Sequence, residues 1–436
     1  VVPHITDEIK RRIRILGDTG RYQIVVTEIG GTVGDIESLP FIEAARQMRY
    51  ELGAQNVLFI HLTLVPYVGA AQELKTKPTQ HSVKQLLEYG VQADVLVCRT
   101  EHALSDDLKA KIALFCNVEA QAVVESRDAR TIYEVPLLLK AQDFDRVALR
   151  KLGLKLGKDP ALTEWKEAVR RIVEPERRVK IALVGKYAEL PDAYKSILEA
   201  LVHAGVRLRV KADVALIQSD DLTDGNAGNA LAECDGVLVA PGFGVRGVAG
   251  KIAAVRYARE SGTPFLGICL GMQMAAVEFA RNVLGLSDAD STEINPDTPH
   301  PVVALMESQV EVRQLGGTMR LGAFDCRLVP GTLAFEIYGR NVVSERHRHR
   351  YEFNNAYRDV CAAAGMVASG LHPELDLVEI VEIPAHPFFI GVQFHPEYKS
   401  TLKNPHPLFV AFVGAALERQ NSRTSTALRL NGVGAV

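Results

Sequence analysis

The sequence shows no strong excess of either charge and no long apolar run. Its 50 lysines and arginines against 53 aspartates and glutamates give a net charge of −3, which argues against broad electrostatic binding of nucleic acid. No stretch approaches the ~18 consecutive apolar residues that a membrane-spanning helix needs, and no secretory signal opens the chain. We therefore expect a soluble, cytoplasmic protein with no membrane or nucleic-acid partner.

Paired cysteines and internal repeats are also missing. The six cysteines are Cys98, Cys116, Cys234, Cys269, Cys326 and Cys361. None belongs to a CxxC pair or to another metal-ligand spacing, and scattered thiols of this kind are typical of a reducing compartment. The length of 436 residues is enough for two or three ordinary domains.

What the sequence does contain is two series of short apolar runs that alternate with helical patterns. The first series covers residues 23–27, 57–64, 94–98 and 122–125. The second covers residues 179–185, 214–218, 236–240, 264–268, 377–383 and 388–394. Buried strands that alternate with helices predict an α/β fold, with two doubly wound parallel-sheet domains in tandem.

Changes in composition mark the boundaries of these domains. We expect a first domain over residues 1–150 and a second over residues 179–418. The charged segment 151–178 between them reads as a linker that contains one helix. Residues 419–436 are polar and are predicted to form a frayed tail.

The most informative local pattern surrounds Cys269. It stands between glycines directly after an apolar run, which fits a strand that turns sharply into a helix and exposes a sulfur beside free backbone N–H groups. Downstream, His395 can accept the thiol proton, and Glu397, two residues further on, can orient that histidine. A lone cysteine in an apolar segment is more often part of the core, but this combination favours a nucleophile that cleaves an amide through a thioester.

A second turn would complete the site. Residues 240–244 (APGFG) follow an apolar run, and their N–H groups can form one side of an oxyanion hole. Pro241 has no N–H, so the donors would be Gly242 and the amide of Leu270 after the nucleophile. The alternative interpretation of this segment is an ordinary loop after a strand.

The first half contains two segments suited to phosphates and metal. Residues 28–38 combine glycines with the carboxylates of Glu28, Asp35 and Glu37, a composition that suits close phosphate approach or Mg²⁺. Residues 75–82 place two lysines and several hydroxyl or amide groups before a helix, which suits a triphosphate. Taken alone, either segment could also be a solvated loop.

Longer strings reveal a resemblance to known families. The second half resembles class I glutamine amidotransferases, which carry the G-x-C-x-G turn with a Cys, His, Glu order. Further strings are EIGGTVGDIES from residue 28, LTLVPY from 62, KTKPTQHS from 75, KIALFCN from 111, GKYAELPDAYKS from 185 and ERHRHRYE from 345. With them, the chain resembles the CTP synthase family from residue 1 to about residue 418.

The resemblance implies a bifunctional ligase. ATP would phosphorylate the 4-oxygen of UTP, and ammonia released from glutamine would travel inside the protein and displace that phosphate to give CTP. Mg²⁺ and ATP are the implied cofactor and co-substrate, GTP is the implied activator, and CTP is the implied feedback inhibitor. Family members form homotetramers, and some polymerise into filaments.

The resemblance also assigns residues to sites. The catalytic residues would be Cys269, His395 and Glu397. Glutamine would contact Gly242, Leu270, Gly271, Met272, Gln273, Glu293 and Arg350. UTP and CTP would contact Asp35, Ile36, Glu37, Lys75, Thr76, Lys77, Pro78, Thr79, Gln80 and Lys111. ATP would contact Arg127, Asp128 and Ala129, and Mg²⁺ would bind Glu28.

Two departures leave alternatives open. The family has a glycine- and lysine-containing P-loop segment for ATP that has no counterpart here, and we expect it to lie before Val1 in the whole protein. Relatives often have glycine where this chain has Pro241. The alternatives to a CTP synthase are a protein that only hydrolyses glutamine and a non-catalytic filament or scaffold protein, although the latter would not need to retain the three catalytic residues.

Overall fold

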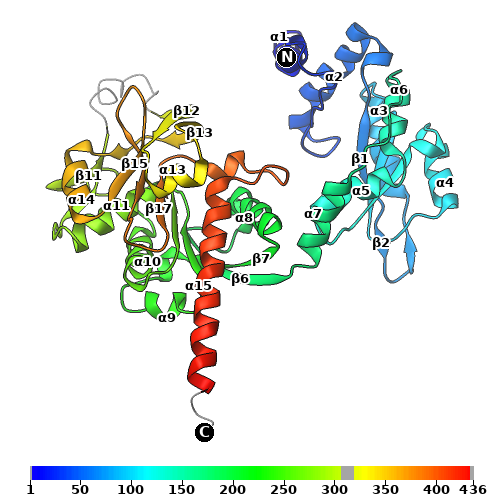
Figure 1. Cartoon of the computed structure of the whole chain (residues 1–436). Helices are drawn as coiled ribbons and strands as arrows, with labels where there is room; N and C mark the ends of the chain where they lie inside the picture. Colours follow the sequence, from blue (N-terminus) through cyan, green and yellow to red (C-terminus); the bar gives the residue numbers. More distant parts are fainter. Residues whose placement is uncertain (1, 306–318, 433–436) are drawn as a thin grey trace. The chain divides into compact units, whose positions relative to one another are not determined.

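The computed structural model describes residues 2–305 and 319–432, with side chains described as far as residue 424. The chain divides into two compact units, Val1–Val169 and Arg170–Val436, and each is described here by itself (Figure 1). The boundary falls within helix α7 (Thr163–Val173), inside the segment that the composition marked as a linker.

The first unit is organised by a three-stranded parallel sheet. Its order is β1 (Ile60–Leu64), β4 (Val95–Thr100), β5 (Val123–Arg127). Four consecutive residues of the central strand, Val95 to Cys98, are buried, because both faces of that strand are covered. On one face, Leu96 and Cys98 share a core cluster with Ile112 of helix α4 (Asp106–Cys116).

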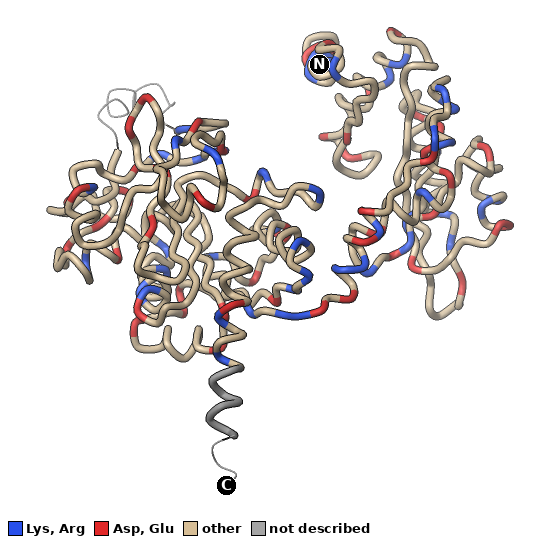
Figure 2. The backbone as a smooth tube through the Cα atoms, viewed as in Figure 1, with Lys and Arg blue, Asp and Glu red and all other residues tan. Residues whose placement is uncertain are grey.

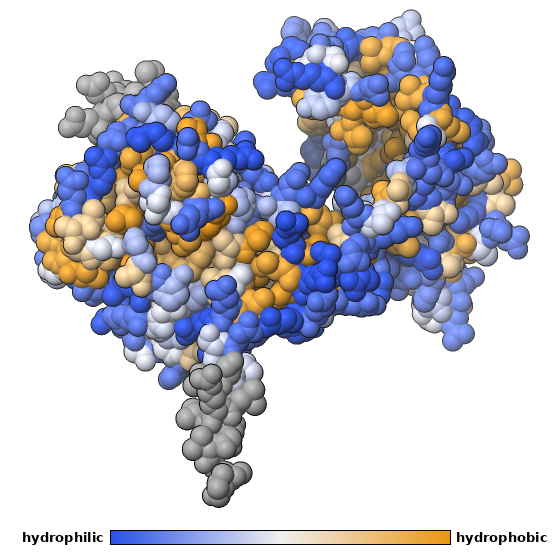
Figure 3. Space-filling view, viewed as in Figure 1, coloured by the Kyte–Doolittle hydropathy of each residue, from blue (hydrophilic) through white to orange (hydrophobic). Residues whose placement is uncertain are grey.

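Helices and a short hairpin complete this unit. They are α1 (His4–Asp18), α2 (Leu39–Leu52), α3 (Lys77–Glu88), α5 (Val135–Lys140), α6 (Phe144–Lys151), and the strands β2 (Tyr67–Val68) and β3 (Glu73–Leu74). Apolar side chains also reach the surface of this unit, part of which is visible in Figure 3. On β1, exposed Ile60, Leu62 and Leu64 alternate with buried His61 and Thr63.

One strand prediction in the first unit is wrong. Residues 23–27 have strand-like composition but form no strand, and most of their side chains are exposed, with Val26 at 88%. Strand propensity reflects packing against neighbouring strands. Among the described residues this segment has no such neighbour, so its backbone does not join a ladder.

The second unit contains a nine-stranded sheet. Its order is β13 (Val342–His349), β12 (Arg320–Leu328), β15 (Val367–Leu371), β16 (Val378–Glu382), β17 (Phe389–Val392), β9 (Phe265–Ile268), β8 (Gly236–Val239), β6 (Arg177–Gly185), β7 (Val210–Gln218). The five strands from β17 to β7 are parallel, as predicted. The strands from β13 to β16 are antiparallel, so this sheet is mixed, and residues 377–383 lie in its antiparallel part.

Helices cover both faces of the parallel part. Val237 and Val239 of β8 belong to the core cluster that contains α10 (Val248–Ser261) and α11 (Leu270–Asn282). Leu238, between them, belongs to the cluster that contains α8 (Lys195–Leu208) and α15 (Pro407–Gly432). Since successive side chains of a strand point to opposite faces, this alternation is the signature of a doubly wound sheet.

Smaller elements complete the second unit. They are α9 (Ala227–Leu231), α13 (Leu333–Tyr338), α14 (Arg358–Ala364), and a small sheet of β10 (Ala289–Ser291), β11 (His300–Ala304) and β14 (Glu352–Phe353). Basic and acidic residues are interspersed along the backbone of both units (Figure 2). No helix in the described part of the chain is both long enough and apolar enough to span a membrane.

Of the predicted frayed tail, residues 419–436, the last four lie outside the described residues. Helix α15 continues to Gly432 (Figure 1). Gln420 Nε2 donates to the carbonyl of Arg178 at 2.8 Å, and Arg423 lies 3.7 Å from Asp235. A helix that is already nucleated by packing extends at little cost when no proline interrupts it, which explains the continuation.

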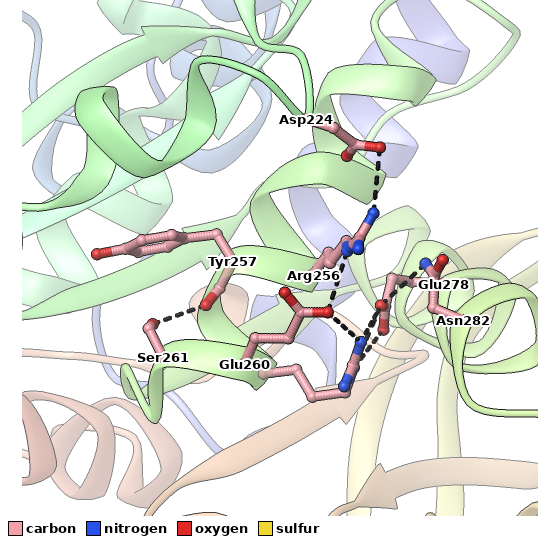
Figure 4. Close-up of polar contacts among 8 residues, drawn as sticks. Asp224, Arg256, Tyr257, Glu260, Ser261, Glu278 and Asn282 are labelled. Carbon is pink, nitrogen blue, oxygen red and sulfur yellow. Dashed lines mark hydrogen bonds and ion pairs between the residues drawn. The ribbon is translucent and has the colours of Figure 1, made fainter.

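An ion pair fastens α11 to α10. Arg259 contacts both carboxylate oxygens of Glu278, with distances down to 2.7 Å, and the Glu278 side chain is fully buried. Asn282 donates to the same carboxylate at 3.1 Å (Figure 4). The helix that begins beside Cys269 is therefore held by an interior charge pair as well as by apolar packing.

We predict that Arg259→Met lowers the free energy of unfolding by about 3–5 kcal/mol, because it leaves a buried carboxylate without its partner. Urea or thermal denaturation measures the change. Arg256→Met is the matched control. Its partners Asp224 and Glu260, labelled in Figure 4, have exposed side chains, so the expected loss is below about 1 kcal/mol. Equal losses in the two variants would contradict the assignment.

Candidate active site

The nucleophile candidate lies on a strained turn. Cys269 connects β9 to α11 with φ 52° and ψ −104°, a conformation that costs a non-glycine residue about 1–3 kcal/mol. Its N–H donates to the carbonyl of Val392 on β17 at 2.7 Å, and its carbonyl accepts from Gln273 N at 3.2 Å. These bonds on both sides hold the turn in place, as the sequence pattern predicted.

Close packing explains the glycines around the turn. A Cβ atom on Gly271 would lie 2.3 Å from the carbonyl oxygen of Val239 on β8. A Cβ atom on Gly267 would lie 2.8 Å from the backbone of Gly271. The first turn of α11 therefore presses directly against the sheet, and only glycine leaves room for that approach.

His395 and Glu397 lie on the segment that follows β17. His395 Nδ1 is 2.7 Å from Glu397 Oε1, both side chains are buried, and the Tyr398 ring stacks on the imidazole at 5.3 Å. Burial opposes the charge on His395, but interactions with Cys269 and Glu397 outweigh it and raise the pKa of the imidazole to about 10. The histidine is thus poised to carry the proton of Cys269.

The contact between histidine and sulfur is looser than the contact to Glu397. His395 Nε2 is buried and forms no hydrogen bond of ordinary length and angle within the described chain. The interaction with the sulfur of Cys269 nevertheless raises the pKa of the imidazole, and it does so more than the interaction with Glu397. An active site without substrate commonly shows such a loose contact.

Two buried lysines hold the loop that was predicted to form the oxyanion hole. Lys251, on α10 and fully buried, donates to the carbonyl of Ala240 at 2.5 Å. Lys186, which follows β6, donates to the carbonyls of Phe243 and Gly244, the latter at 2.8 Å. Burial, with the charge of Lys186 nearby, lowers the pKa of Lys251 to about 7.

Because the carbonyl groups of this loop point to the lysines, its N–H groups point away from them. Within the described chain, no protein acceptor takes the N–H of Gly242 or Phe243. Leu270 contributes a further free N–H, because the first turn of a helix has no intrahelical acceptors. These N–H groups can stabilise an oxyanion at a carbonyl attacked by Cys269.

Glu293 holds the same loop from another side chain. Its Oε1 accepts the N–H of Gly244 at 2.7 Å, so one oxygen of this carboxylate anchors the loop. The second oxygen takes part in no hydrogen bond or ion pair in the described part of the chain. The side chain of Met272 is fully buried against Gly391, and it therefore supports the turn by packing.

Gln273 leads to a residue that the sequence reasoning missed. Gln273 Nε2 donates to the carbonyl of Tyr351 at 3.0 Å and to Gln393 Oε1 at 3.2 Å. Gln393 is fully buried, and its Nε2 lies 3.7 Å from Cys269 Sγ. A signal existed in the sequence, because Gln393 stands two residues before His395 and extended backbone places such residues on the same side.

Arg350 lies on the turn between β13 and β14 and is exposed. A buried charge cluster holds this turn. His349 Nε2 is 2.8 Å from Glu352 Oε1, and Arg320 binds Glu352 at 3.1 Å and Glu379 at 2.7 Å. Burial raises the pKa of Glu379 to about 7, although the Arg320 charge opposes that rise. Arg350 thus lies exposed on a turn that buried ion pairs hold in place.

A hollow of about 610 Å³ adjoins the triad. Its lining residues are Met319, Leu321, Arg346, Arg348 and Tyr398. It meets the triad through Tyr398, which stacks on His395, and through Arg348, whose carbonyl oxygen lies 4.0 Å from the sulfur. Arg346 and Arg348, which could have been a solvated face only, therefore line the approach to the site.

The segment predicted to bind nucleotide and Mg²⁺, residues 28–38, contains a hydrogen-bonded turn. The turn at residues 31–35 is closed by a hydrogen bond from Thr32 N to Asp35 Oδ2 at 2.9 Å, with Gly31 and Gly34 at positive φ. The side chains of Glu28, Ile36 and Glu37 are exposed. These side chains are therefore accessible, and their contact with a ligand stays a prediction.

The lysine segment begins the helix rather than preceding it. Lys77 and Pro78 occupy the first turn of α3, and Gln80 Nε2 donates to Thr76 Oγ1 at 3.1 Å. Thr79 is fully buried and donates to the carbonyl of Leu64, so its side chain is structural. The remaining polar groups face a helix N-terminus, where anions bind favourably.

Glu73 links two more of the predicted lysines. It pairs with Lys75, and this hydrogen bond, followed by the charges of Lys75 and Lys111, lowers the pKa of Glu73. Both lysines therefore act on one carboxylate. An anionic ligand would find the two ammonium groups in the same neighbourhood.

The residues predicted to contact ATP follow the last strand of the sheet. Arg127 Nε is 3.1 Å from Glu125, and Asp128 pairs with Arg99 at 3.3 Å. Asp128 N also donates to the carbonyl of Thr100 at the end of β4. Arg127, Asp128 and Ala129 thus lie at the carboxyl edge of this sheet.

The described residues include no cluster of three or more His, Cys, Asp or Glu side chains able to hold a metal ion. Within this part of the chain, no hydrogen bond or ion pair engages the carboxylate of Glu28. Mg²⁺ is commonly bound by one or two carboxylates together with phosphates and water. Glu28 therefore fits the role of a single protein ligand of Mg²⁺, with phosphates and water as the other ligands.

Comparison with known proteins decides the family. Residues 1–154 match the family described as CTP synthase N-terminus, and residues 189–415 match glutamine amidotransferase class-I. CTP synthases from Christiangramia forsetii and Flavobacterium johnsoniae are 59% and 60% identical to 96% of this chain, which spans 77% and 78% of their lengths. The chain belongs to the CTP synthase family. Its resemblance to that family, the basis of the sequence prediction, is confirmed.

A solved structure supports the fold of the second unit. The glutaminase domain of Trypanosoma brucei CTPS with bound acivicin is 41% identical, with a TM-score of 0.53 over 55% of this chain and 94% of that domain. The two α/β units predicted from the sequence agree with this assignment. CTP synthases are glutamine-hydrolysing ligases that convert UTP to CTP in pyrimidine biosynthesis.

We predict that Gly271→Ala displaces α11, because the new Cβ would lie 2.3 Å from the carbonyl oxygen of Val239. The expected result is a loss of glutamine hydrolysis of roughly 100-fold, since small displacements of catalytic groups have effects of this size. Glutaminase kinetics measure it. Gly228→Ala is the control, because that glycine lies on helix α9 with open space around it. Similar losses in both variants would contradict the packing argument.

We predict that Glu397→Gln lowers the pKa of His395 and decreases glutamine hydrolysis by roughly 10²–10⁴-fold, as loss of an orienting carboxylate does elsewhere. The raised pKa of His395 stabilises the folded state below the unfolded pKa of about 6.5, and this stability is lost as the pH rises through about 10. In the variant the total loss should be smaller and should be complete at a lower pH.

NMR titration of His395 and unfolding measurements as a function of pH test the Glu397 prediction. Glu336→Gln, an exposed position on α13, serves as the control. An unchanged His395 titration in Glu397→Gln would refute the orienting role of this carboxylate.

Proposed function

We propose that this chain hydrolyses glutamine at Cys269 and delivers the ammonia for the amination of UTP. The observation that carries the proposal is the burial of Cys269, on a strained turn, together with the paired His395 and Glu397, opposite a loop with free N–H groups. A merely structural cysteine needs neither a paired histidine nor an oxyanion hole.

The proposed reaction runs through a thioester. The thiolate of Cys269 attacks the side-chain carbonyl carbon of glutamine, and the N–H groups of Gly242 and Leu270 stabilise the oxyanion. Protonated His395 gives its proton to the departing nitrogen, so that ammonia leaves and a thioester remains. His395 then takes a proton from water, which attacks the thioester and releases glutamate and the thiolate.

The remaining glutamine contacts follow from the geometry. The amide nitrogen of Gln273 is occupied by protein acceptors, so its oxygen is the group available to the substrate. The free oxygen of Glu293 suits the α-ammonium group, and the exposed guanidinium of Arg350 suits the α-carboxylate. Gly271 and Met272 shape the turn below them.

In the first unit, Lys75, Lys77 and Lys111 would bind the triphosphate of UTP or CTP, with Thr76, Pro78, Thr79 and Gln80 shaping that end of α3. Residues 35–37 would contact the CTP inhibitor, and residues 127–129 would contact the adenine region of ATP. Glu28 would be a ligand of Mg²⁺, which neutralises phosphate charge when it is bound. These assignments rest on the family resemblance and, for residues 127–129, on their position at the carboxyl end of β5.

From the family resemblance we also propose activation by GTP and inhibition by CTP. On the same basis we propose homotetramers with the capacity to form filaments, and a cytoplasmic location. We favour a CTP synthase over a protein that only hydrolyses glutamine. CTP formation from ammonia distinguishes the two, because the latter would form none.

We predict that Cys269→Ala abolishes glutamine hydrolysis and glutamine-dependent CTP formation, while ammonia-dependent CTP formation persists. Assays with UTP and Mg-ATP, supplied with either ammonia or glutamine plus GTP, test this. Cys361→Ala, which changes another buried cysteine, should retain both activities. Glutamine hydrolysis by the Cys269→Ala variant would exclude Cys269 as the nucleophile.

A further inference from the structure

Gln393 connects the sulfur of Cys269 to the buried polar interior of the second unit. It follows the last residue of β17, its side chain is fully buried, and Nε2 lies 3.7 Å from Cys269 Sγ, within range of an N–H to sulfur hydrogen bond. Its oxygen, Oε1, lies 3.2 Å from Gln273 Nε2. Both ends of this amide therefore have a partner, and water has no access to either.

A backbone carbonyl fixes the orientation of both amides. The carbonyl oxygen of Tyr351 can only accept, so the group of Gln273 that faces it at 3.0 Å must be the NH₂. The same NH₂ then faces Gln393, which must present its oxygen. Reversing the Gln393 amide would set two NH₂ groups against each other and a carbonyl oxygen against the sulfur. The N–H of Gln393 consequently points to Cys269.

The other groups around the sulfur do not provide this donor. The carbonyl oxygen of Arg348, 4.0 Å away, accepts only and would not favour a thiolate. His395 provides the exchangeable proton, which leaves the site during the reaction. Gln393 is uncharged and keeps its N–H throughout, so it can stay bonded to the sulfur while the histidine changes its protonation state.

We propose that Gln393 is a catalytic residue that donates a hydrogen bond to the thiolate of Cys269, and that Gln273 is the positioning residue that holds it in that orientation. The inference deepens the proposed function and rests on Cys269 as the nucleophile. The bond favours the thiolate before attack and again when the sulfur leaves the thioester, because a hydrogen bond to an anion is stronger than one to a neutral group. Gln273 thereby serves the sulfur as well as the substrate.

Alkylation by iodoacetamide tests the bond without the oxyanion hole or glutamine. The rate at Cys269, followed by mass spectrometry of its peptide at neutral pH, should fall roughly 10-fold in Gln393→Met, because a hydrogen bond to a charged group contributes that much or more. It should fall further in Gln393→Glu, which keeps the shape but sets a carboxylate oxygen against the sulfur. The kcat for glutamine should fall in parallel, with KM almost unchanged.

Two further variants separate this role from packing. Gln420→Met removes an amide that bonds to Arg178 and Asp235, and it should alkylate like the parent protein. Gln273→Met should slow alkylation about 3-fold, a smaller loss than for a direct contact, by releasing Gln393. Thermal denaturation checks each fold, and if the Gln393 variants unfold, Gln273→Met decides the question.

Three results would each overturn the inference. The first is parent-like alkylation in Gln393→Met, and the second is alkylation of Gln393→Glu that is no slower than that of Gln393→Met. The third is parent-like alkylation in Gln273→Met. Failure of the proposed function has a different signature. In that case Cys269→Ala would still hydrolyse glutamine, whatever the alkylation rates of the Gln393 variants.

Discussion

The close approach of α11 to the sheet is the constraint on which the site depends. Gly271 lies so near the carbonyl of Val239 that no side chain fits, and the amide of Cys269 bonds to Val392 on the neighbouring strand. The turn between β9 and α11 has to be tight to permit both contacts, which places Cys269 at positive φ. Strain, sulfur position and free amide groups are therefore consequences of one packing arrangement.

The rest of the site is built by the interior rather than by surface loops. Two buried lysines, Lys186 and Lys251, bind carbonyls of the loop after β8 and thereby free its N–H groups. A buried ammonium group costs free energy unless it is well bonded, so these lysines suit carbonyl groups that can satisfy them. The buried ion pairs of Arg320 with Glu352 and Glu379 hold the turn that carries Arg350. Preorganisation of this kind leaves little to rearrange when charge develops on the substrate.

Much of the fold followed from local pattern. Alternating apolar runs predicted the parallel strands of both units, and the glycines around Cys269 predicted the turn. The features that local pattern did not specify have a common cause. Residues 23–27 have strand composition without a neighbouring strand, the antiparallel strands have the same composition as parallel ones, and the helix after residue 418 is continued from a packed segment. Each depends on a partner that local sequence does not specify.

By itself, the sequence determined the family, the order of the elements and the three residues Cys269, His395 and Glu397, because short spacings and long strings are local properties. Only the tertiary structure decided that Gln393 faces the sulfur, that Glu293 anchors a loop, and that Lys251 lies behind that loop. These residues are distant from Cys269 along the chain or alternate with apolar core positions. Their roles arise from which strands and helices pack together, and local sequence does not specify that packing.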